Sequence, residues 1–358
     1  MKPGKLPESH LKRSVLKTVY RMNAVRDIGQ QLLPDVGIDG ASLALDGGTD
    51  RLLVAQGIVD LPVKRPVFLA VTKALNNLYA AGGRVSGIAL SIIVPADYKE
   101  SGVKALMEEV QDCKAGVTIP SVLILGGDIR ISHSVNCPVI AVNAIGTPAH
   151  EGGQETLYKL QPDMDIVMTK WTGMEATWLL AENRHDALHT RFSDAYIDIG
   201  KQFGDYLSVA AEASVLQDMG IWAVHDVSGG GVFAALWELL EPSGLGCRVD
   251  LKNIPIKQET IEFAEYFHAN PYMLAGSGSL LAVTEDGEKV VQALEAAGIF
   301  AAVIGKTTRE KARAVCLEPE KVFVEEASVN SRRRHEREQR FLVPPKSDEI
   351  YQILSSKA

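Results

Sequence analysis

The stretch HDVSGGGVFAALWELLEPSG, from His225 to Gly244, places an imidazole and a carboxylate directly before three consecutive glycines and a strongly apolar segment. Val224 ends an apolar run before it. After the glycines, apolar residues recur at the spacing of one helix face, at Val232, Phe233, Leu236, Trp237 and Leu240. The stretch therefore predicts a strand, a glycine turn and the start of a helix.

A glycine turn at a helix start is suited to binding an anion. Free backbone N–H groups point out at the positive end of the helix dipole, and glycines remove the Cβ atoms that would hold a phosphate away. The candidate phosphate-binding residues are Ser228, Gly229, Gly230 and Gly231, with the Ser228 hydroxyl as an added donor or as a helix cap.

Two other interpretations of the turn stay open. The glycines can simply supply positive φ in a tight turn that Ser228 caps. Alternatively, GxGxxA over 229–234, followed nineteen positions after Gly231 by Asp250 (250 − 231), is the pattern of a dinucleotide-binding fold. His225 and Asp226 stand before the first glycine, and Pro242 with Gly244 stops the helix early; both features oppose the dinucleotide interpretation. Adjacent strand residues point to opposite faces, so His225 and Asp226 are not expected to form a base–acid pair.

Around this stretch the chain alternates between strand-like and helix-like segments. Strand-like runs include RLLVAQGIV, VSGIALSIIV, SVLILGG and CPVIAVNAIG, whereas VKALMEEV has helical spacing. The polar stretch PAHEGGQET then reads as a linker before a second alternation of similar length. We therefore predict a two-domain α/β protein with a helical extension at 1–35, domains at 36–150 and 157–325, and a charged tail at 326–358.

The composition narrows the classes of function. With 358 residues, 46% of them apolar, the chain is long enough for two cores, and its net charge of −8 argues against a nucleic-acid partner. The cysteines are scattered and indicate neither a zinc site nor a disulfide framework. No signal peptide or membrane span is apparent, so we expect a cytoplasmic protein that does not contact a membrane. The basic residues of a predicted helix over 6–33, and the charge run SRRRHEREQR, are expected to be solvated.

Taken together, HDVSGGGVFAALWELLEPSGLGCRVD and NPYMLAGSGSLLAV resemble the C-terminal domain of the AIR synthase superfamily (PurM-like), nearest its hydrogenase-maturation branch, HypE. In the first half, GIDGASL, ALNNLYAAGG and LILGGDI are similar to the family's GDDAAV, VNDLAAMGA and VTGGDT stretches, in the same order. The resemblance covers roughly residues 37–307. It implies a mixed α/β fold, with a dimerising sheet in the N-terminal half and an α/β sandwich in the C-terminal half.

The resemblance also implies an activity. Family members bind ATP between the two domains and use it to activate an amide or carbamoyl oxygen as a phosphate ester. This implies a homodimeric, ATP-dependent enzyme with Mg²⁺, and a small-molecule or protein acceptor that the sequence does not identify.

Family positions carry over to individual residues of this chain. Asp39 and Asp128 would be metal ligands, because Mg²⁺ prefers carboxylate and phosphate oxygens. Asn76 and Lys170 would lie on the phosphate side, and Gly173 opens a second strand-to-helix entry that could bind an anion. The leading acid of the glycine turn, Asp226, is the candidate catalytic residue; it could also bind a metal or brace the loop.

The chain departs from the family at several acids. Ile38 and Asn77 stand where relatives have Asp, and AQGIV at 55–59 lacks an acid, so Mg²⁺ would bind weakly, not at all, or through groups such as Asp46 or Asp60. The C-terminal LSSKA also differs from the PRIC-like tail whose cysteine carries the carbamoyl group in HypE. We therefore expect a relative without HypE activity, and keep open a catalytically reduced dimeric scaffold or ligand-binding protein.

Overall fold

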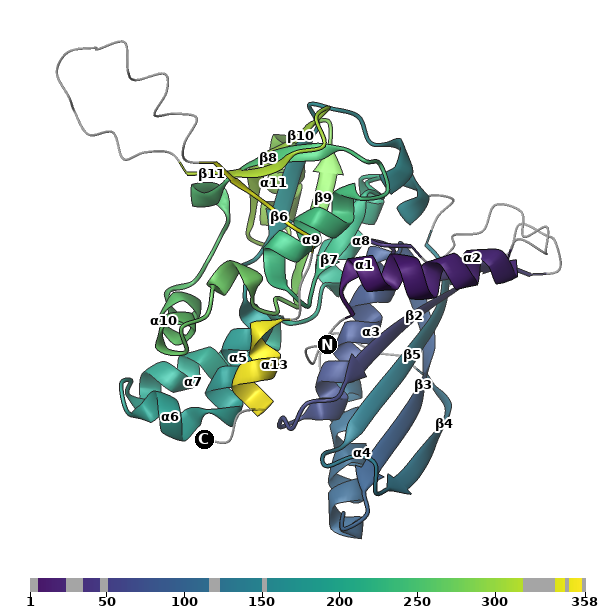
Figure 1. The fold of residues 1–358 in the computed structure, drawn as a ribbon, viewed down its shortest axis with the longest axis vertical. Coiled ribbons are helices and arrows are strands. Elements are labelled where there is room, and N and C mark those ends of the chain that lie inside the picture. Colours follow the sequence, from purple (N-terminus) through teal and green to yellow (C-terminus); the bar gives the residue numbers. More distant parts are fainter. Residues whose placement is uncertain are drawn as a thin grey trace.

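The structure of the chain is a computed structural model that describes residues 6–23, 35–45, 51–115, 123–149, 153–317, 339–344 and 348–355. Two mixed sheets dominate it, one in each half of the chain (Figure 1). The two-domain α/β architecture predicted from the sequence is confirmed.

The first sheet has the order β1-β2-β5-β3-β4, and all neighbours are antiparallel except β3 and β4. Its strands are β1 (Gly40–Ala44), β2 (Arg51–Val59), β3 (Gly83–Pro95), β4 (Leu123–Ser132) and β5 (Val139–Pro148). Helices α3 (Pro66–Ala80) and α4 (Glu100–Ala115) accompany it. At Gly57 a Cβ would lie 2.3 Å from the Ala70 carbonyl oxygen, so the absence of a side chain there lets α3 lie directly on β2.

The second sheet has the order β12-β11-β8-β10-β6-β9-β7, and of its neighbours only β11 and β8 are parallel among the described residues. Its strands are β6 (Asp165–Thr169), β7 (Val224–Val227), β8 (Gly246–Asp250), β9 (Ser279–Thr284), β10 (Ala301–Thr308), β11 (Arg313–Cys316) and β12 (Gln339–Phe341). The strand β12 lies within the segment predicted to be a charged tail. Residues 339–341 thus return to the edge of the second sheet.

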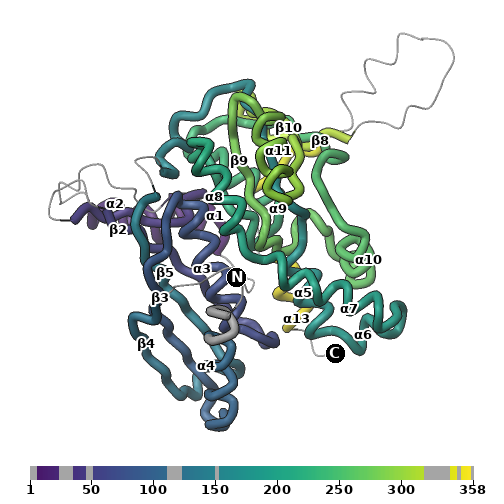
Figure 2. Tube along the Cα trace, turned by 180° about the vertical axis from the view of Figure 1, so that it is seen from behind, coloured from purple at the N-terminus to yellow at the C-terminus, as the bar shows by residue number. Residues whose placement is uncertain are grey.

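Helices cover both faces of the second sheet. Helix α9 (Gly231–Leu240) packs Val232, Leu236 and Leu239 against one face, and α8 (Ala210–Asp218) and α11 (Gly287–Ala296) pack on the other. Figure 1 shows α9 in front of the sheet, and Figure 2, seen from behind, shows α11. Burial of the apolar face of α9 fixes where the glycine turn before it must lie.

A group of short helices stands beside the second sheet and adjoins the first. It comprises α5 (Met174–Asn183), α6 (His185–His189), α7 (Asp194–Gln202), α10 (Gln258–Tyr266) and α13 (Glu349–Ser355); short 3-10 segments lie at Gln154–Lys159, Phe203–Tyr206, Leu251–Asn253 and Pro271–Met273. The Trp178 ring of α5 meets the Phe68 ring of α3 at 5.7 Å, edge to face. One continuous apolar core therefore joins α3 to this helical group.

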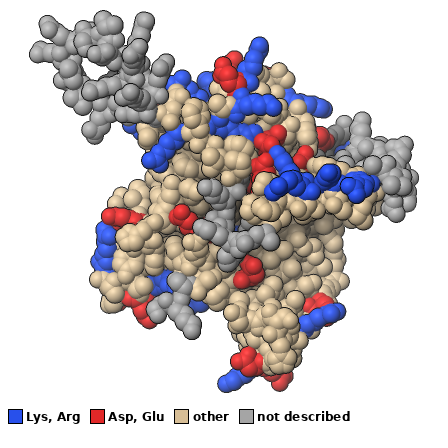
Figure 3. Space-filling model, in the orientation of Figure 1, with Lys and Arg blue, Asp and Glu red and all other residues tan. Residues whose placement is uncertain are grey.

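The N-terminal segment forms α1 (Glu8–His10), a π-helical stretch (Leu11–Leu16) and α2 (Lys17–Asn23). Figure 3 shows its basic side chains gathered along one face of the molecule. They are not all merely solvated, as the sequence had suggested, because Lys12 forms ion pairs with Glu8 and Glu241. The rest of the predicted helix, 24–33, lies outside the described residues. Within the described chain, no helix combines the length and apolar character needed to cross a bilayer.

Candidate functional site

The glycine turn has the predicted strand–turn–helix form, and its glycines have different roles. Gly230 is the left-handed N-cap of α9 with φ 84°. A Cβ on Gly231 would lie 2.5 Å from the Tyr272 carbonyl oxygen, so Gly231 is required for packing against that segment. A Cβ on Gly229 would meet nothing within 4 Å, and Gly229 and Ser228 line an open cleft. Ser228 and Gly229 are therefore the turn residues that an external ligand can approach.

The cleft lies between the two halves and has a volume of about 470 Å³. It is lined by the end of β2, by α3, by the start of α5, by the glycine turn and by the C-terminal segment. Lys73 is the one lysine or arginine among the described residues of its lining, and its Nζ lies 2.7 Å from Glu175 Oε1. The lining acids are Asp39, Asp60, Glu175, Asp226, Glu238 and Asp348. This excess of carboxylates favours either a cationic ligand or an anionic ligand that binds together with a cation.

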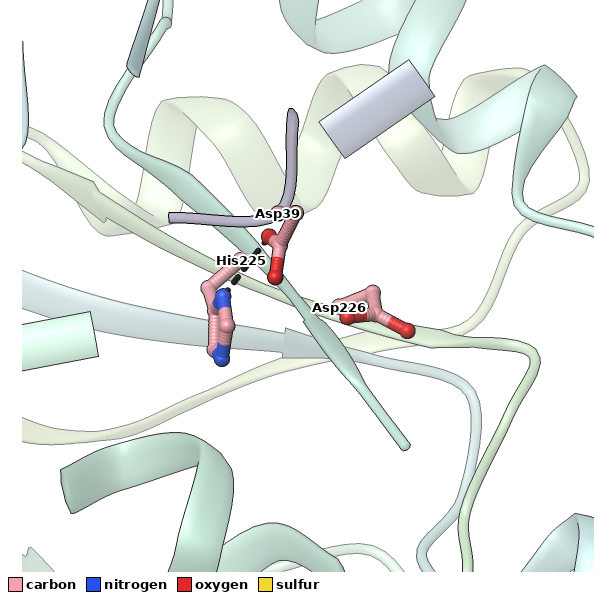
Figure 4. Close-up of side chains that lie close together, drawn as sticks. All are labelled: Asp39, His225 and Asp226. Carbon is pink, nitrogen blue, oxygen red and sulfur yellow. Dashed lines mark hydrogen bonds and ion pairs between the residues drawn. The ribbon is translucent and has the colours of Figure 1, made fainter. Parts of the chain in front are cut away.

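His225 lies beside the cleft as a buried ion pair. Its Nδ1 is 2.7 Å from Asp39 Oδ2, and its Nε2 is 3.3 Å from Glu238 Oε2 (Figure 4 shows the bond to Asp39). Burial alone would lower the pKa of His225, but the Asp39 and Glu238 carboxylates outweigh it and raise the pKa to about 10. The ring is therefore an imidazolium at neutral pH that donates both N–H groups. Both ring nitrogens of His225 are thus used in bonds to Asp39 and Glu238. This agrees with the expectation that His225 does not pair with Asp226.

Asp39 is held from a second side by Gln154. The Gln154 amide donates to Asp39 Oδ2 at 2.7 Å and to the Val224 carbonyl at 3.2 Å, while its own oxygen accepts the Asp39 N–H at 2.9 Å. Gln154 is fully buried. These bonds fix the loop that precedes β1 against the strand that leads into the glycine turn.

Among the described residues, Asp39, His225 and Asp226 form the cluster of side chains closest in composition to a metal site. One ligand atom from each lies within 4.8 Å of the others. However, the imidazolium already occupies the nearest position to Asp39 Oδ2, and a second cation beside it would be repelled. The arrangement as it stands does not fit Mg²⁺ at Asp39.

Asp128 is not part of this group. It lies on β4, at the opposite end of the sheet order from β1, with its side chain 56% exposed and paired to Arg130. Within the described chain, the structure does not bring the two predicted metal ligands, Asp39 and Asp128, together. Asp60 lines the cleft, whereas Asp46 lies outside the described residues.

Asn76 and Lys170 are structural in this arrangement. The buried Asn76 amide donates to the Leu207 carbonyl and accepts the Val209 N–H, which ties α3 to the second half. Its neighbour Asn77 is the one that lines the cleft.

The Lys170 ammonium is buried, where desolvation lowers its pKa, and it is held by Glu212 and two carbonyls, Tyr206 and Ser208. The N–H groups of the Lys170 ammonium are therefore already used within the protein. Contrary to the expectation from the sequence, Lys170 is not available to bind phosphate. Gly173 likewise does not open into the cleft: it is the left-handed N-cap of α5, and a Cβ there would lie 2.6 Å from Thr260 Cγ2.

Sequence reasoning missed several residues of the site. Glu238 could have been noticed as a lone acid on the apolar face of α9. Gln154 fell within a stretch read as a linker and gave no signal. Lys73, Asp348 and Tyr351 were missed because their importance arises only from contacts between distant segments.

Comparisons with known proteins agree with this architecture. Residues 161–316 match the family model of the AIR synthase related protein, C-terminal domain. A Methanocaldococcus jannaschii protein, named provisionally for hydrogenase expression or formation, is 22% identical over 86% of this chain and 89% of its own length. Carbamoyl dehydratase HypE of Rhodobacter capsulatus is 23% identical over 83% of this chain and 85% of its own.

Solved structures share the fold. HypE in its complex with HypF has a TM-score of 0.65 at 15% identity, covering 93% of this chain and 100% of that one. HypE in complex with ATP has a TM-score of 0.63 at 14% identity, covering 97% of this chain and 100% of that one. The resemblance to the AIR synthase superfamily and its HypE branch is confirmed.

Proposed function

We propose that this chain, whose residues 161–316 form an AIR synthase-related C-terminal domain, binds ATP in the cleft between its two halves. The observation that carries the proposal is the open Ser228–Gly229 edge of the turn, at the N-terminus of α9, facing the cleft that also holds Lys73. Backbone N–H groups at a helix start and a nearby ammonium are the groups that recognise phosphate. One structural neighbour is a HypE in complex with ATP, which supports the same choice of ligand.

The proposed reaction is the activation of an amide or carbamoyl oxygen. That oxygen attacks the γ-phosphorus of ATP, an O–P bond forms, the bond to the β,γ-bridging oxygen breaks, and ADP leaves. The acceptor loses an N–H proton as its oxygen becomes a phosphate ester. Asp226 lines the cleft beside the glycine turn, which makes it the candidate acceptor of that proton. Magnesium would enter with the nucleotide, since Asp39 does not offer it a ready position.

The acceptor is a small molecule or a protein. A HypE neighbour is described in complex with HypF, which makes a protein acceptor or donor a reasonable class to test. We also propose a homodimer, because every residue of β4 from Leu123 to Ile131 is exposed in the single chain, including five large apolar side chains.

A second candidate function is a dimeric ligand-binding protein without turnover. The specific observation in its favour is the His225–Asp39 ion pair, which uses a carboxylate that the family resemblance assigns to metal. ATP turnover that is lost in Asp226→Asn would exclude this alternative.

Calorimetric and thermal-shift titration with magnesium–ATP tests nucleotide binding. A ligand at about 100 times its dissociation constant should stabilise the protein by about 2.7 kcal/mol. We expect Gly229→Ala to fold normally but to bind ATP more weakly, because its new methyl group points into open cleft. Asp198→Asn on α7 is the control, because Asp198 is 58% exposed and lies outside the cleft lining, and it should bind like the wild type; an equal loss there would show that the effect of Gly229→Ala is not specific to the cleft. No shift in any protein would refute nucleotide binding.

A further inference from the structure

The C-terminal segment 348–355 forms part of the wall of the same cleft. Three of its residues, Asp348, Ile350 and Tyr351, line the cleft. Asp348, Ile350 and Leu354 are almost fully buried, at 4%, 1% and 4% exposure. In Figure 1 the helix α13 lies against α5, facing the first half of the molecule. The segment thus brings its own side chains to the cleft wall beside the glycine turn.

The Asp348 carboxylate lies on the glycine turn. Its Oδ2 accepts the Gly230 N–H at 2.9 Å, and its Oδ1 accepts the Ile350 N–H at 3.0 Å. Gly230 is the N-cap of α9, so this carboxylate lies where free N–H groups and the helix dipole attract an anion. Burial raises the pKa of Asp348 to about 6, so the group is an anion at neutral pH.

The remaining contacts hold the segment by both halves of the molecule. The Arg184 guanidinium donates to the Ile353 and Leu354 carbonyls at 2.7 and 2.9 Å, which satisfies the C-terminal end of α13. Glu349 accepts the Asn270 N–H at 3.1 Å. Tyr351 forms a hydrogen bond with Asp60, which follows β2 in the first half. The Asp348 contact is thus one of several, and losing it need not undock the segment.

We propose that Asp348 is an intramolecular competitor for the anion position of the glycine turn, and that it must withdraw from Gly230 before a phosphoryl group binds there. This inference rests on the proposed nucleotide function and adds a mode of regulation to it. A phosphate oxygen and the Asp348 carboxylate require the same N–H, and both cannot accept it at full strength. Any event that lifts the segment would open the site.

Binding of inorganic phosphate and of magnesium–ATP to Asp348→Ala tests the competition. Because the phosphate would no longer have to displace a charge-assisted hydrogen bond to the Gly230 N–H, Asp348→Ala should tighten binding of both probes by about tenfold or more. Glu349→Gln is the matched control: it removes the same charge one residue away, keeps an oxygen that can accept the Asn270 N–H, leaves the Asp348–Gly230 contact in place, and should bind like the wild type.

Hydrogen exchange of the peptide spanning 348–355 gives a second readout. We expect saturating phosphate or magnesium–ATP to speed its exchange in the wild type. Unchanged affinity in Asp348→Ala with normal ATP binding would overturn the competition and leave the nucleotide function intact. Tight phosphate binding without ATP binding would uphold the competition and refute the nucleotide function. Equal tightening in Glu349→Gln, or slower exchange on binding, would show that the segment does not compete at Gly230.

Discussion

At the scale of single residues, the His225 imidazolium binds two carboxylates that are distant in the sequence. Asp39 comes from the loop before the first sheet, and Glu238 comes from α9 in the second half. Both are nearly buried, so without the cation they would be two uncompensated charges in a poorly solvated place. The ion pairs of His225 with Asp39 and Glu238 therefore stabilise the folded state and also fix the position of these two acids in the cleft wall.

His225→Gln should lower the free energy of unfolding by about 3–5 kcal/mol, the usual cost of removing one partner of a buried ion pair. Urea titration of both proteins measures this difference. The control is His189→Gln, because His189 is exposed and its pair with Asp194 should contribute no more than about 1 kcal/mol. A loss below 1 kcal/mol in His225→Gln would show that the ion pair is not formed.

The His225 contribution should also depend on pH in a defined direction. Desolvation opposes the charged ring, but its two carboxylate partners raise the pKa to about 10, above the value of about 6.5 in the unfolded chain. The folded state therefore binds more protons between these values. The stability advantage of wild type over His225→Gln should be full below about pH 6.5 and should fall as pH rises toward about 10. An advantage that grew with pH would contradict the assignment.

At the scale of elements, α13 shows what a sequence pattern can and cannot indicate. The β7–turn–α9 unit was predictable because its signals are local: an apolar run, three glycines and helical spacing. The position of α13 was not predictable, because it depends on a hydrogen bond between Asp348 and Gly230, which are more than a hundred residues apart in the sequence. The family pattern placed Asn76 and Lys170 on the phosphate side for a related reason. Their polar groups instead form hydrogen bonds between segments that are distant in the sequence, which no local pattern indicates.

The docking of α13 should weaken as pH rises through the acidic range. Burial is the main cause of the raised pKa of Asp348; Glu175 on α5 raises it further, whereas the Gly230 and Ile350 N–H groups and Lys73 on α3 lower it. Because the folded pKa of about 6 exceeds the unfolded value of about 3.9, stability should fall by up to about 3 kcal/mol between about pH 4 and pH 6 and then level off.

Asp348→Asn, which resembles the protonated acid, provides the comparison for that pH dependence. Its free energy of unfolding should match that of the wild type near pH 4 and exceed it at pH 7. Urea titrations of both proteins across this range measure the gap. A wild type that became relatively more stable with rising pH would mean that Asp348 gains more from its N–H donors than it loses by burial.

At the scale of the whole molecule, β4 is the surface that the single chain leaves unfinished. It is the edge strand of the first sheet, and Leu123, Ile124, Leu125, Ile129 and Ile131 expose between 42% and 69% of their surface. An exposed edge with so many apolar side chains is an association surface, since soluble proteins otherwise protect such edges with charge. The dimer implied by the family resemblance would cover this strand.

The double variant Ile129→Asp, Ile131→Asp should convert the proposed dimer to a monomer, because two carboxylates would be desolvated without partners at the centre of the interface. Light scattering coupled to gel filtration measures the mass directly. Ile261→Asp on α10, where Ile261 is 38% exposed and far from β4 in the fold, is the control and should leave the mass unchanged. The cleft is built from residues of one chain, so magnesium–ATP binding should survive in the monomer. If monomerisation abolished binding, a second copy of the chain would have to complete the nucleotide site, and Asp128 on β4 would become the first residue to test for that role.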